Sequence, residues 1–452
     1  MKTKERTFGV TSGGEKLAYA LGDLGSNFVW TFISSFLTLY YTDSVLMSAA
    51  LVGTIMLACR IFDGVSDILM GMMLEKTRTK MGKAKPWFGG SIIPLVVIQL
   101  LVFNVPGSMS NGAKVAWIIV TYFLLTVVAY TINNLSYHAM LSRISLTGED
   151  RNKVSSLRGV FAFLAGLVLA ILTPKLLAGF GGEKVQSAWT TTALVYSVLC
   201  LIFEAICFFG CKEKISCYDE KTEVKKEKPD LKLGIRMLLH SKYFYISVIV
   251  FIVTYVLNGM TLATSVYYAR DVLGSADLYS IIALVDVFAV VVGISLSPKL
   301  FKKFGKRSVM IAGSVIAVVG CVVGLVGSRN AILVFVATAL NGFGLAPYVS
   351  GLFTFAPDII EYFERKSGAR YEGLVTAVNS VGIKIGTGLA SAFIGWGLAA
   401  GHYEGALAVQ PETAITAEIV LRFAVPIVMS ILSIVCMLFW DMDKQLAKKD
   451  ET

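Results

Sequence analysis

Apolar stretches about as long as a membrane is thick alternate with short polar segments along the whole chain. A helix needs roughly 20 apolar residues to cross the hydrocarbon core of a bilayer. Twelve stretches meet this requirement, at residues 17–42, 48–74, 87–105, 113–141, 154–178, 189–210, 243–268, 277–298, 309–327, 331–356, 371–399 and 416–440. The pattern predicts an all-α membrane protein with twelve transmembrane helices.

The composition excludes a soluble protein with buried helices. Of the 452 residues, 55% are hydrophobic and 16% are charged, whereas soluble proteins carry about 25% charged residues. Too few polar residues remain to cover a soluble core of this size. We therefore expect a multi-pass protein embedded in a lipid bilayer.

The net charge of +10 reflects membrane topology. The basic residues gather in alternate connecting segments, at 75–86, 141–158, 211–236, 299–307 and the C-terminal tail. Basic loops face the cytoplasm by the positive-inside rule, so both termini are predicted to be cytoplasmic, and nucleic acid is excluded as a partner. The polar N-terminus and the long first apolar run do not fit a cleavable signal peptide. These features indicate an inner (cytoplasmic) membrane protein.

The helices fall into two sets of six. The polar stretch 211–236 predicts a cytoplasmic linker between an N-terminal bundle, 1–210, and a C-terminal bundle, 237–452, with its tail. Gly82–Lys83 after the second helix corresponds to Gly305–Lys306 after the eighth, and polar loops are expected after the fourth and tenth helices. This layout resembles the major facilitator fold, whose two halves are parallel repeats with substrate sites near the midplane.

The segment RIFDGVSD, residues 60–67, places charges inside an apolar run. Arg60, Asp63 and Asp67 lie three and seven residues apart, on one helix face. A charge at mid-membrane costs roughly 2.5–3.5 kcal/mol on insertion scales, and two neighbouring carboxylates repel, so at least one should bind a proton or a cation. The pattern predicts a Na⁺ or H⁺ site. An Arg60–Asp63 salt bridge that only fastens the helix is the alternative, and it leaves the second acid unpaired.

The same residues carry a family resemblance. RIFDGVSD, followed by Gly71 and TRTKMGKAKPW, with YALGDLGSNF and LYYTD in the first helix, resembles the glycoside–pentoside–hexuronide:cation symporter family. The resemblance covers essentially the whole chain. It implies a twelve-helix sugar symporter driven by Na⁺, Li⁺ or H⁺.

The resemblance also implies functional residues. It assigns coupling-cation binding, with Na⁺ at the two carboxylates, to Asp63, Asp67, Ser66 and Thr131. It assigns substrate binding to Asn27, Arg60, Tyr130, Asn134, His138, Arg158, Asn379, Ser380 and Lys384. No cofactor is implied beyond the coupling ion.

Three substrate positions depart from the family pattern. Asn27 and Asn134 stand where the typical member has aspartates, and His138 stands where it has tryptophan. With those two acids neutralised, the basic residues Arg60, Arg158 and Lys384 would face only Asp63 and Asp67. This charge balance favours an anionic sugar such as a hexuronide or glucuronide, with a neutral pentoside or xyloside as the alternative.

For each of several further polar residues, both a functional and a structural role are open. Glu204 and Asp286 are intramembrane acids that could join a proton path, although the absence of a partner recognisable in sequence favours a structural role. Asp23 lies near Asn27 and could face the cavity. A cytoplasmic gate that holds the two halves together by ion pairs is predicted at Arg78, Gly82, Lys83, Arg151, Asp358 and Glu361, with ordinary positive-inside bias as the alternative.

The sequence thus predicts a cation-coupled sugar symporter that works by alternating access, as a monomer in the lipid bilayer. No GxSxG, HExxH or GxxxxGK[ST] motif is present, so an enzyme is not expected. A lysolipid transporter of the same fold is the first alternative. A non-transporting sensor or assembly protein is the second.

Overall fold

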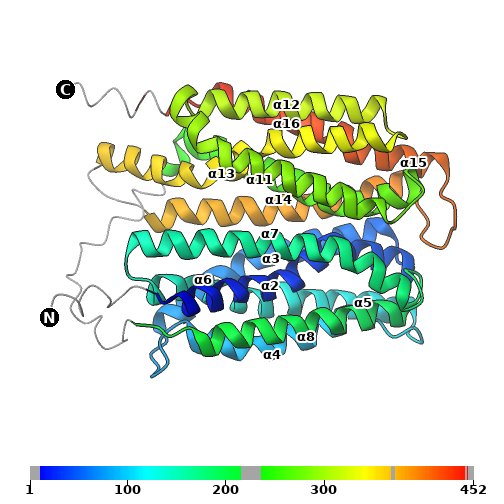
Figure 1. Ribbon diagram of the computed structural model, residues 1–452, viewed down its shortest axis with the longest axis horizontal. Coiled ribbons are helices and arrows are strands. Elements are labelled where there is room, and N and C mark those ends of the chain that lie inside the picture. Colours follow the sequence, from blue (N-terminus) through cyan, green and yellow to red (C-terminus); the bar gives the residue numbers. More distant parts are fainter. Residues whose placement is uncertain (1–10, 215–235, 368–371, 443–444, 446–452) are drawn as a thin grey trace. The chain divides into compact units, whose positions relative to one another are not determined.

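A computed structural model describes residues 11–214, 236–367, 372–442 and 445. In these ranges the chain is all-α, and pairing of extended backbone is limited to an isolated bridge between Thr79 and Gly82. Twelve long helices result when each π-helical segment is taken together with the helix that it continues (Figure 1). The predicted fold class is confirmed.

The first six helices have the following bounds: α2 (Gly13–Leu39) with η1 (Tyr40–Ser44), α3 (Ala49–Lys76), α4 (Lys85–Val102), α5 (Asn111–Phe123) with η2 (Leu124–Tyr130) and α6 (Thr131–Ile144), α7 (Gly148–Gly179), and α8 (Gln186–Gly210). The last six are α10 (Lys242–Tyr267) with η4 (Tyr268–Val272), α11 (Leu278–Phe304), α12 (Lys306–Val326), α13 (Ala331–Ser367), α14 (Glu372–Ala400), and α15 (Glu412–Ile419) with η5 (Val420–Ala424) and α16 (Val425–Leu438).

Eleven of these helices in the described ranges are long and apolar enough to cross a membrane. The twelfth is α2, which carries Glu15, Lys16 and Asp23 and is rich in glycine and hydroxyl side chains. Most of its residues are nevertheless buried inside the protein. Its lower hydropathy therefore reflects polar contacts with neighbouring helices.

Two segments expected to be polar loops are largely helical. Helix α13 continues to Ser367, where Glu361 and Arg365 form an ion pair at i,i+4, a spacing that supports a helix. Helix α7 begins at Gly148, directly after Thr147, whose side chain accepts a hydrogen bond from the Asp150 backbone N–H. Capping and side-chain pairs extend these helices into polar sequence, which hydropathy alone did not anticipate.

The chain divides into two compact units. Unit 1 consists of 1–47 and 58–224, and unit 2 of 48–57 and 225–452, so the first turns of α3 group with unit 2. Most of the predicted linker, 211–236, lies outside the described residues. The predicted assignment of 1–210 and 237–452 as two functional domains stays a prediction.

In unit 1, polar groups fasten α2 to its neighbours. The Tyr19 and Tyr137 rings stack with centroids 4.3 Å apart, and each hydroxyl donates to the other residue's backbone carbonyl, at 3.0 and 2.6 Å. The buried Asp150 carboxylate accepts from the Thr11 hydroxyl at 2.7 Å and from Lys16 at 2.7 Å. These contacts fix the start of α2 against α6 and α7, which carry most of the candidate site.

Candidate cation and sugar site

The candidate cation site is built around Asp63 on α3. Its carboxylate accepts a hydrogen bond from the Thr131 hydroxyl at 2.8 Å, and Arg60 Nη1 lies 3.5 Å from its second oxygen. The Ser66 hydroxyl donates to the Asp63 backbone carbonyl at 2.9 Å and lies 3.3 Å from the Thr131 hydroxyl. Three of the four predicted cation-site residues are therefore in one cluster, and Asp67, half-buried, follows Asp63 by one helical turn.

A π-helical segment presents Thr131 to this cluster. The segment η2 ends at Tyr130, and the Thr131 hydroxyl reaches the Thr126 carbonyl, five residues earlier, at 3.1 Å. Such single-turn π segments are frequent at functional sites. Here the wide turn sets the direction in which α6 presents its first side chains.

Arg60 is held by aromatic rings as well as by Asp63. The residue is 4% exposed, and its guanidinium lies 4.2 Å from the centre of the Trp30 ring, which stacks on Tyr130 at 4.5 Å. The Arg60 Nε has no hydrogen-bond partner among the described residues. Cation–π contact in a desolvated setting contributes about 2 kcal/mol, which offsets part of the cost of burying this charge.

The donor set fits a monovalent cation. Its side-chain ligands would be carboxylate and hydroxyl oxygens, which hard cations prefer. Among the residues that the structure describes, no group of three or more His, Cys, Asp or Glu side chains could hold a metal ion.

The predicted substrate residues of unit 1 form a second polar group. Arg158 on α7 lies with its Nη1 2.6 Å from the His138 Nδ1, and the Asn134 amide donates to the Tyr130 hydroxyl at 3.3 Å. The Asn27 amide donates to the Asp23 backbone carbonyl at 2.8 Å. Of the six predicted substrate residues in unit 1, Arg60 is buried and the other five are half-buried or exposed. They form a polar set on α2, α6 and α7, beside the cation cluster.

The structure describes fewer contacts for the predicted substrate residues of unit 2. Lys384 is half-buried on α14. Asn379 and Ser380 belong to the same helix, but they lie outside the residues whose side chains the structure describes. Their predicted contact with substrate stays a prediction.

The predicted gate residues make contacts inside their own units. Lys83 donates its backbone N–H to the Glu213 carboxylate at 3.0 Å, and Arg151 donates to the Ser145 carbonyl at 3.2 Å. In unit 2, Asp358 pairs with Lys306 at 2.5 Å. Arg78 is exposed in the α3–α4 loop, and Glu361 pairs within its own helix. A gate between the two halves stays a prediction.

The structure gives a steric reason for glycine at position 82, which the sequence did not reveal. Its φ of +111° lies in the region that favours glycine, and an added Cβ would clash with the Glu213 carboxylate. That carboxylate also accepts the backbone N–H groups of Ala84 and Lys85, at 2.8 and 2.7 Å, and an Arg143 N–H at 2.5 Å. Hydrogen bonds to Glu213 thus connect the loop between α3 and α4 to the segment that follows α8.

Sequence reasoning missed two charged or aromatic partners. Trp30 lies one turn beyond Asn27, and only the fold shows that its ring covers Arg60. Arg422 in unit 2 is 5% exposed and donates to the Thr338 hydroxyl at 3.2 Å and to the Thr261 carbonyl at 3.1 Å. The signal was present in the sequence, because Arg422 interrupts an apolar run just as Arg60 does.

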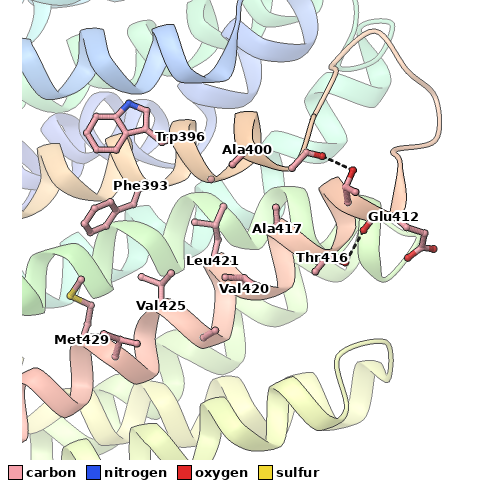
Figure 2. A pocket seen from close by; sticks show the side chains of 15 residues that line it. Phe393, Trp396, Ala400, Glu412, Thr416, Ala417, Val420, Leu421, Val425 and Met429 are labelled. Atoms are coloured by element: carbon pink, nitrogen blue, oxygen red, sulfur yellow. Dashed lines mark hydrogen bonds between the residues drawn. The ribbon is translucent and has the colours of Figure 1, made fainter.

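A hollow in unit 2 has different chemistry. It has a volume of about 960 Å³ and lies between α14 and the helix formed by α15, η5 and α16. Figure 2 shows Phe393 and Trp396 on one side and Leu421, Val425 and Met429 on the other. Such an apolar lining has few groups that could hydrogen-bond sugar hydroxyls, so we place the candidate sugar site in the polar set of unit 1.

The comparisons with known proteins identify the family. Residues 18–444 match the profile described as MFS/sugar transport protein. The chain belongs to this family. The predicted resemblance is confirmed, and the chain is a multi-pass membrane transporter, not an enzyme.

Among its relatives is the isoprimeverose transporter of Lactiplantibacillus pentosus, 31% identical over 95% of this chain and 89% of that protein. The inner membrane symporter YicJ of Escherichia coli is 26% identical over 94% of this chain and 90% of its own length. The glucuronide carrier protein homolog of Escherichia coli is 25% identical over 82% of this chain and 80% of that protein.

Solved structures show the same fold. A crystal structure of a D-xylose-proton symporter superposes with a TM-score of 0.67 at 14% identity, covering 95% of this chain and 97% of the other. A crystal structure of the nucleoside transporter NupG gives a TM-score of 0.64 at 13% identity, covering 94% of this chain and 100% of the other. At this identity the likeness concerns the fold alone.

Proposed function

We propose that this transporter is a cation-coupled symporter of a sugar or glycoside in the inner membrane, with both termini cytoplasmic. The observation that carries the proposal is the buried Asp63 carboxylate, which accepts a hydrogen bond from the Thr131 hydroxyl and is followed by Asp67 one turn later. The Ser66 hydroxyl completes the cluster through the Asp63 backbone carbonyl and the Thr131 hydroxyl. The names of the symporter and sugar-transporter relatives support it. The basic cytoplasmic loops support the orientation.

In this proposal, Na⁺ or H⁺ binds at Asp63 and Asp67, with Ser66 and Thr131 as neutral ligands. The bound cation offsets the negative charge of these carboxylates. Arg60 lies beside them, in contact with Asp63 and with the Trp30 ring that stacks on Tyr130. Tyr130 also contacts Asn134 of the sugar set. The aromatic pair therefore links the two binding clusters physically.

Coupling follows from this link. A cation that raises sugar affinity must have its own affinity raised by sugar by the same factor. Alternating exposure of the loaded site, by movement of one six-helix bundle against the other, then moves both solutes in one direction. A single chain contains all the groups that this cycle requires, so we propose a functional monomer.

The first test uses the purified full chain and the cation itself. Thermal stability is compared in NaCl, LiCl and choline chloride at equal ionic strength, and across pH in choline chloride. A ligand at about a hundred times its dissociation constant adds about 2.7 kcal/mol to the free energy of unfolding. We expect stabilisation by Na⁺ or by protons in the wild type and in the matched control Glu149→Gln, which alters an exposed carboxylate.

The second test measures uptake into proteoliposomes with isoprimeverose, a methyl xyloside and a phenyl glucuronide as probes. Accumulation should require a Na⁺ or proton gradient and should be lost in Asp63→Asn and Asp67→Asn. Uphill uptake by both variants would overturn the proposal. Uptake of a lysophospholipid with no uptake of any sugar would favour the lysolipid alternative instead.

A further inference from the structure

The proposed transport of sugar and cation leaves the apolar hollow of unit 2, between α14 and the helix formed by α15, η5 and α16, without a role. Its volume of about 960 Å³ lies within the range of about 300–1,000 Å³ that is usual for small-molecule pockets. Three of its lining residues, Trp396, Val420 and Val428, are 43%, 42% and 63% exposed. The hollow therefore opens to the surface of the protein.

Glycines hold the two helices in contact beside the hollow. A Cβ added to Gly397 would lie 2.6 Å from the Leu421 side chain, and one added to Gly401 would lie 2.5 Å from the Ala417 Cβ. The helices therefore cannot move closer together to fill the space, which small lining residues such as Ala424 leave open. Because proteins are otherwise close-packed, another molecule is needed to fill it.

The hollow is elongated and lies between two helices that are long and apolar enough to cross a membrane. Its lining on the last helix runs from Glu412 to Met429 (Figure 2), a length of about 25 Å at about 1.5 Å per residue. The hydrocarbon core of a bilayer is about 30 Å thick. Water is absent from that core, and apolar cavities take up apolar molecules. These dimensions and surroundings fit the acyl chain of a membrane lipid.

One end of the hollow carries a pair of opposite charges. Glu412, in the first turn of α15, lines the hollow and forms an ion pair with Arg329 at 2.6 Å. Their side chains are 77% and 62% exposed, so each has room for a further partner. A zwitterionic lipid headgroup carries the complementary charges, since a phosphate pairs with a guanidinium and an ammonium pairs with a carboxylate.

The Glu412 carboxylate also favours one kind of zwitterionic headgroup. A primary ammonium donates hydrogen bonds, as that of lysine does, whereas a trimethylated ammonium has no N–H to donate. We propose that the hollow binds the acyl chain of a phosphatidylethanolamine, with the lipid phosphate at Arg329 and its ammonium at Glu412. This site goes beyond the proposed function, because the lipid stays bound and is not the transported substrate.

The competing explanation is that any lipid of the surrounding bilayer fills the hollow without preference. In that case Glu412 serves only α15, because a negative side chain in the first turn interacts favourably with the helix dipole. The two explanations differ in whether the headgroup affects occupancy of the hollow, and in whether Glu412 is responsible for that effect.

Trp396 provides the readout. Its indole N–H donates to the Thr54 hydroxyl at 3.1 Å, which fixes the ring beside the hollow, and bromine atoms on an acyl chain quench tryptophan fluorescence on contact. The purified full chain is reconstituted in phosphatidylcholine bilayers with increasing shares of brominated phosphatidylethanolamine, phosphatidylcholine or phosphatidylglycerol. The Trp396 signal is the difference between each protein and the same protein carrying Trp396→Phe. We expect half-maximal quenching at an about tenfold lower share of phosphatidylethanolamine than of phosphatidylcholine, as one charge-assisted hydrogen bond predicts.

Matched variants separate the headgroup from the acyl chain. Glu412→Gln should abolish the preference for phosphatidylethanolamine, whereas Glu149→Gln, at an exposed carboxylate on α7, should keep it. Ala424→Phe places a ring in the hollow and should reduce quenching by every lipid several-fold, whereas Val319→Phe, at an exposed position of α12, should not. Val428→Phe, at an exposed position of the lining, replaces Ala424→Phe if that variant fails to fold.

Equal quenching by the three brominated lipids would overturn the proposal in favour of ordinary bilayer lipid. A preference for phosphatidylethanolamine that Glu412→Gln leaves unchanged would overturn the headgroup site. A Trp396 that none of the lipids quenches would show that lipid does not enter the hollow, and would also overturn the proposal. None of these measurements involves sugar or the coupling cation, so their failure would leave the symporter proposal intact.

Discussion

Asp63 and Glu204 are two of the carboxylates that unit 1 buries, and their surroundings differ. Asp63 has a positive partner, Arg60, and its hydroxyl neighbours include the half-buried Ser66. Glu204 is 0% exposed, and its hydrogen bonds come from the neutral side chains of Ser26 at 3.0 Å and Asn133 at 2.8 Å. Both are acids in apolar helices, yet only Asp63 is surrounded by additional oxygen ligands on a partly accessible face.

The difference shows why burial alone does not identify a coupling site. Glu204 on α8 joins Ser26 on α2 and Asn133 on α6, so it connects three helices of the unit. Asp63 instead lies beside the half-buried Ser66, in the cluster proposed to bind the coupling cation. We therefore assign Glu204 to the architecture of unit 1 and Asp63 to ion coupling, and the following variants test that assignment.

The largest effect is expected for Asp63→Asn. An asparagine oxygen can still accept from Thr131, but the negative charge that pairs with Arg60 and would bind the cation is lost. We expect cation-driven sugar accumulation to disappear while downhill sugar exchange persists, as measured in proteoliposomes. Accumulation at the wild-type level would contradict the role assigned to Asp63.

Glu204 should show the opposite behaviour. Glu204→Ala removes the acceptor of the Asn133 amide, whereas the Ser26 hydroxyl keeps the Gly22 carbonyl at 3.2 Å. An unsatisfied buried polar group costs about 1–3 kcal/mol. Glu204→Gln keeps the shape and can still accept from Asn133, so it should lose much less stability and keep coupled uptake. Thermal unfolding and the same uptake assay distinguish the two roles. Loss of coupling in a stably folded Glu204→Gln protein would remove the contrast with Asp63.

A third carboxylate, Glu213, extends the comparison to the loop between α3 and α4. Gly82→Ala places a Cβ against this carboxylate at a positive φ, and we expect a loss of about 1–3 kcal/mol in the free energy of unfolding. In the Glu213→Ala background the clash is absent, so the same substitution should cost less. A double-mutant cycle by thermal unfolding measures the coupling. Strictly additive losses would show that Gly82 is required by its backbone conformation alone.

The smallest effect is expected for Asp441, which follows α16. Hydrogen bonds from Lys242, at 2.8 Å, and from Tyr243, at 2.7 Å, hold the pKa of its carboxyl below the usual value. A lowered pKa means that the contribution is present at neutral pH and is lost as the pH falls below about 4. Because the pair is partly exposed, Asp441→Asn should cost only about 0.2–1 kcal/mol at neutral pH. Unfolding curves of the two proteins should converge in acid.

The sequence predicted the helices and the shared face of Arg60 and Asp63, because both follow from local spacing. The pairing of these two residues, stated there as the alternative to a cation site, follows from the same spacing. Contacts between helices were harder to predict: Trp30 over Arg60, Arg422 against Thr338 and Glu213 against Gly82 depend on helix rotation and packing. Residues Asp358 and Glu361 were expected in a loop because polar composition is no guide to where a capped helix ends.

The π segment η2 sets the rotation of α6, which carries residues of both the cation cluster and the sugar set. Each residue of a helix turns its side chain by about 100°, and the extra width of Leu124–Tyr130 is equivalent to one inserted residue. Thr131 of the cation cluster and Asn134 and His138 of the sugar set all follow this segment on α6. Deleting a single residue within it would therefore turn both clusters away together. Under the proposed function, a change of helix length at this segment would therefore alter ion binding and sugar recognition at once.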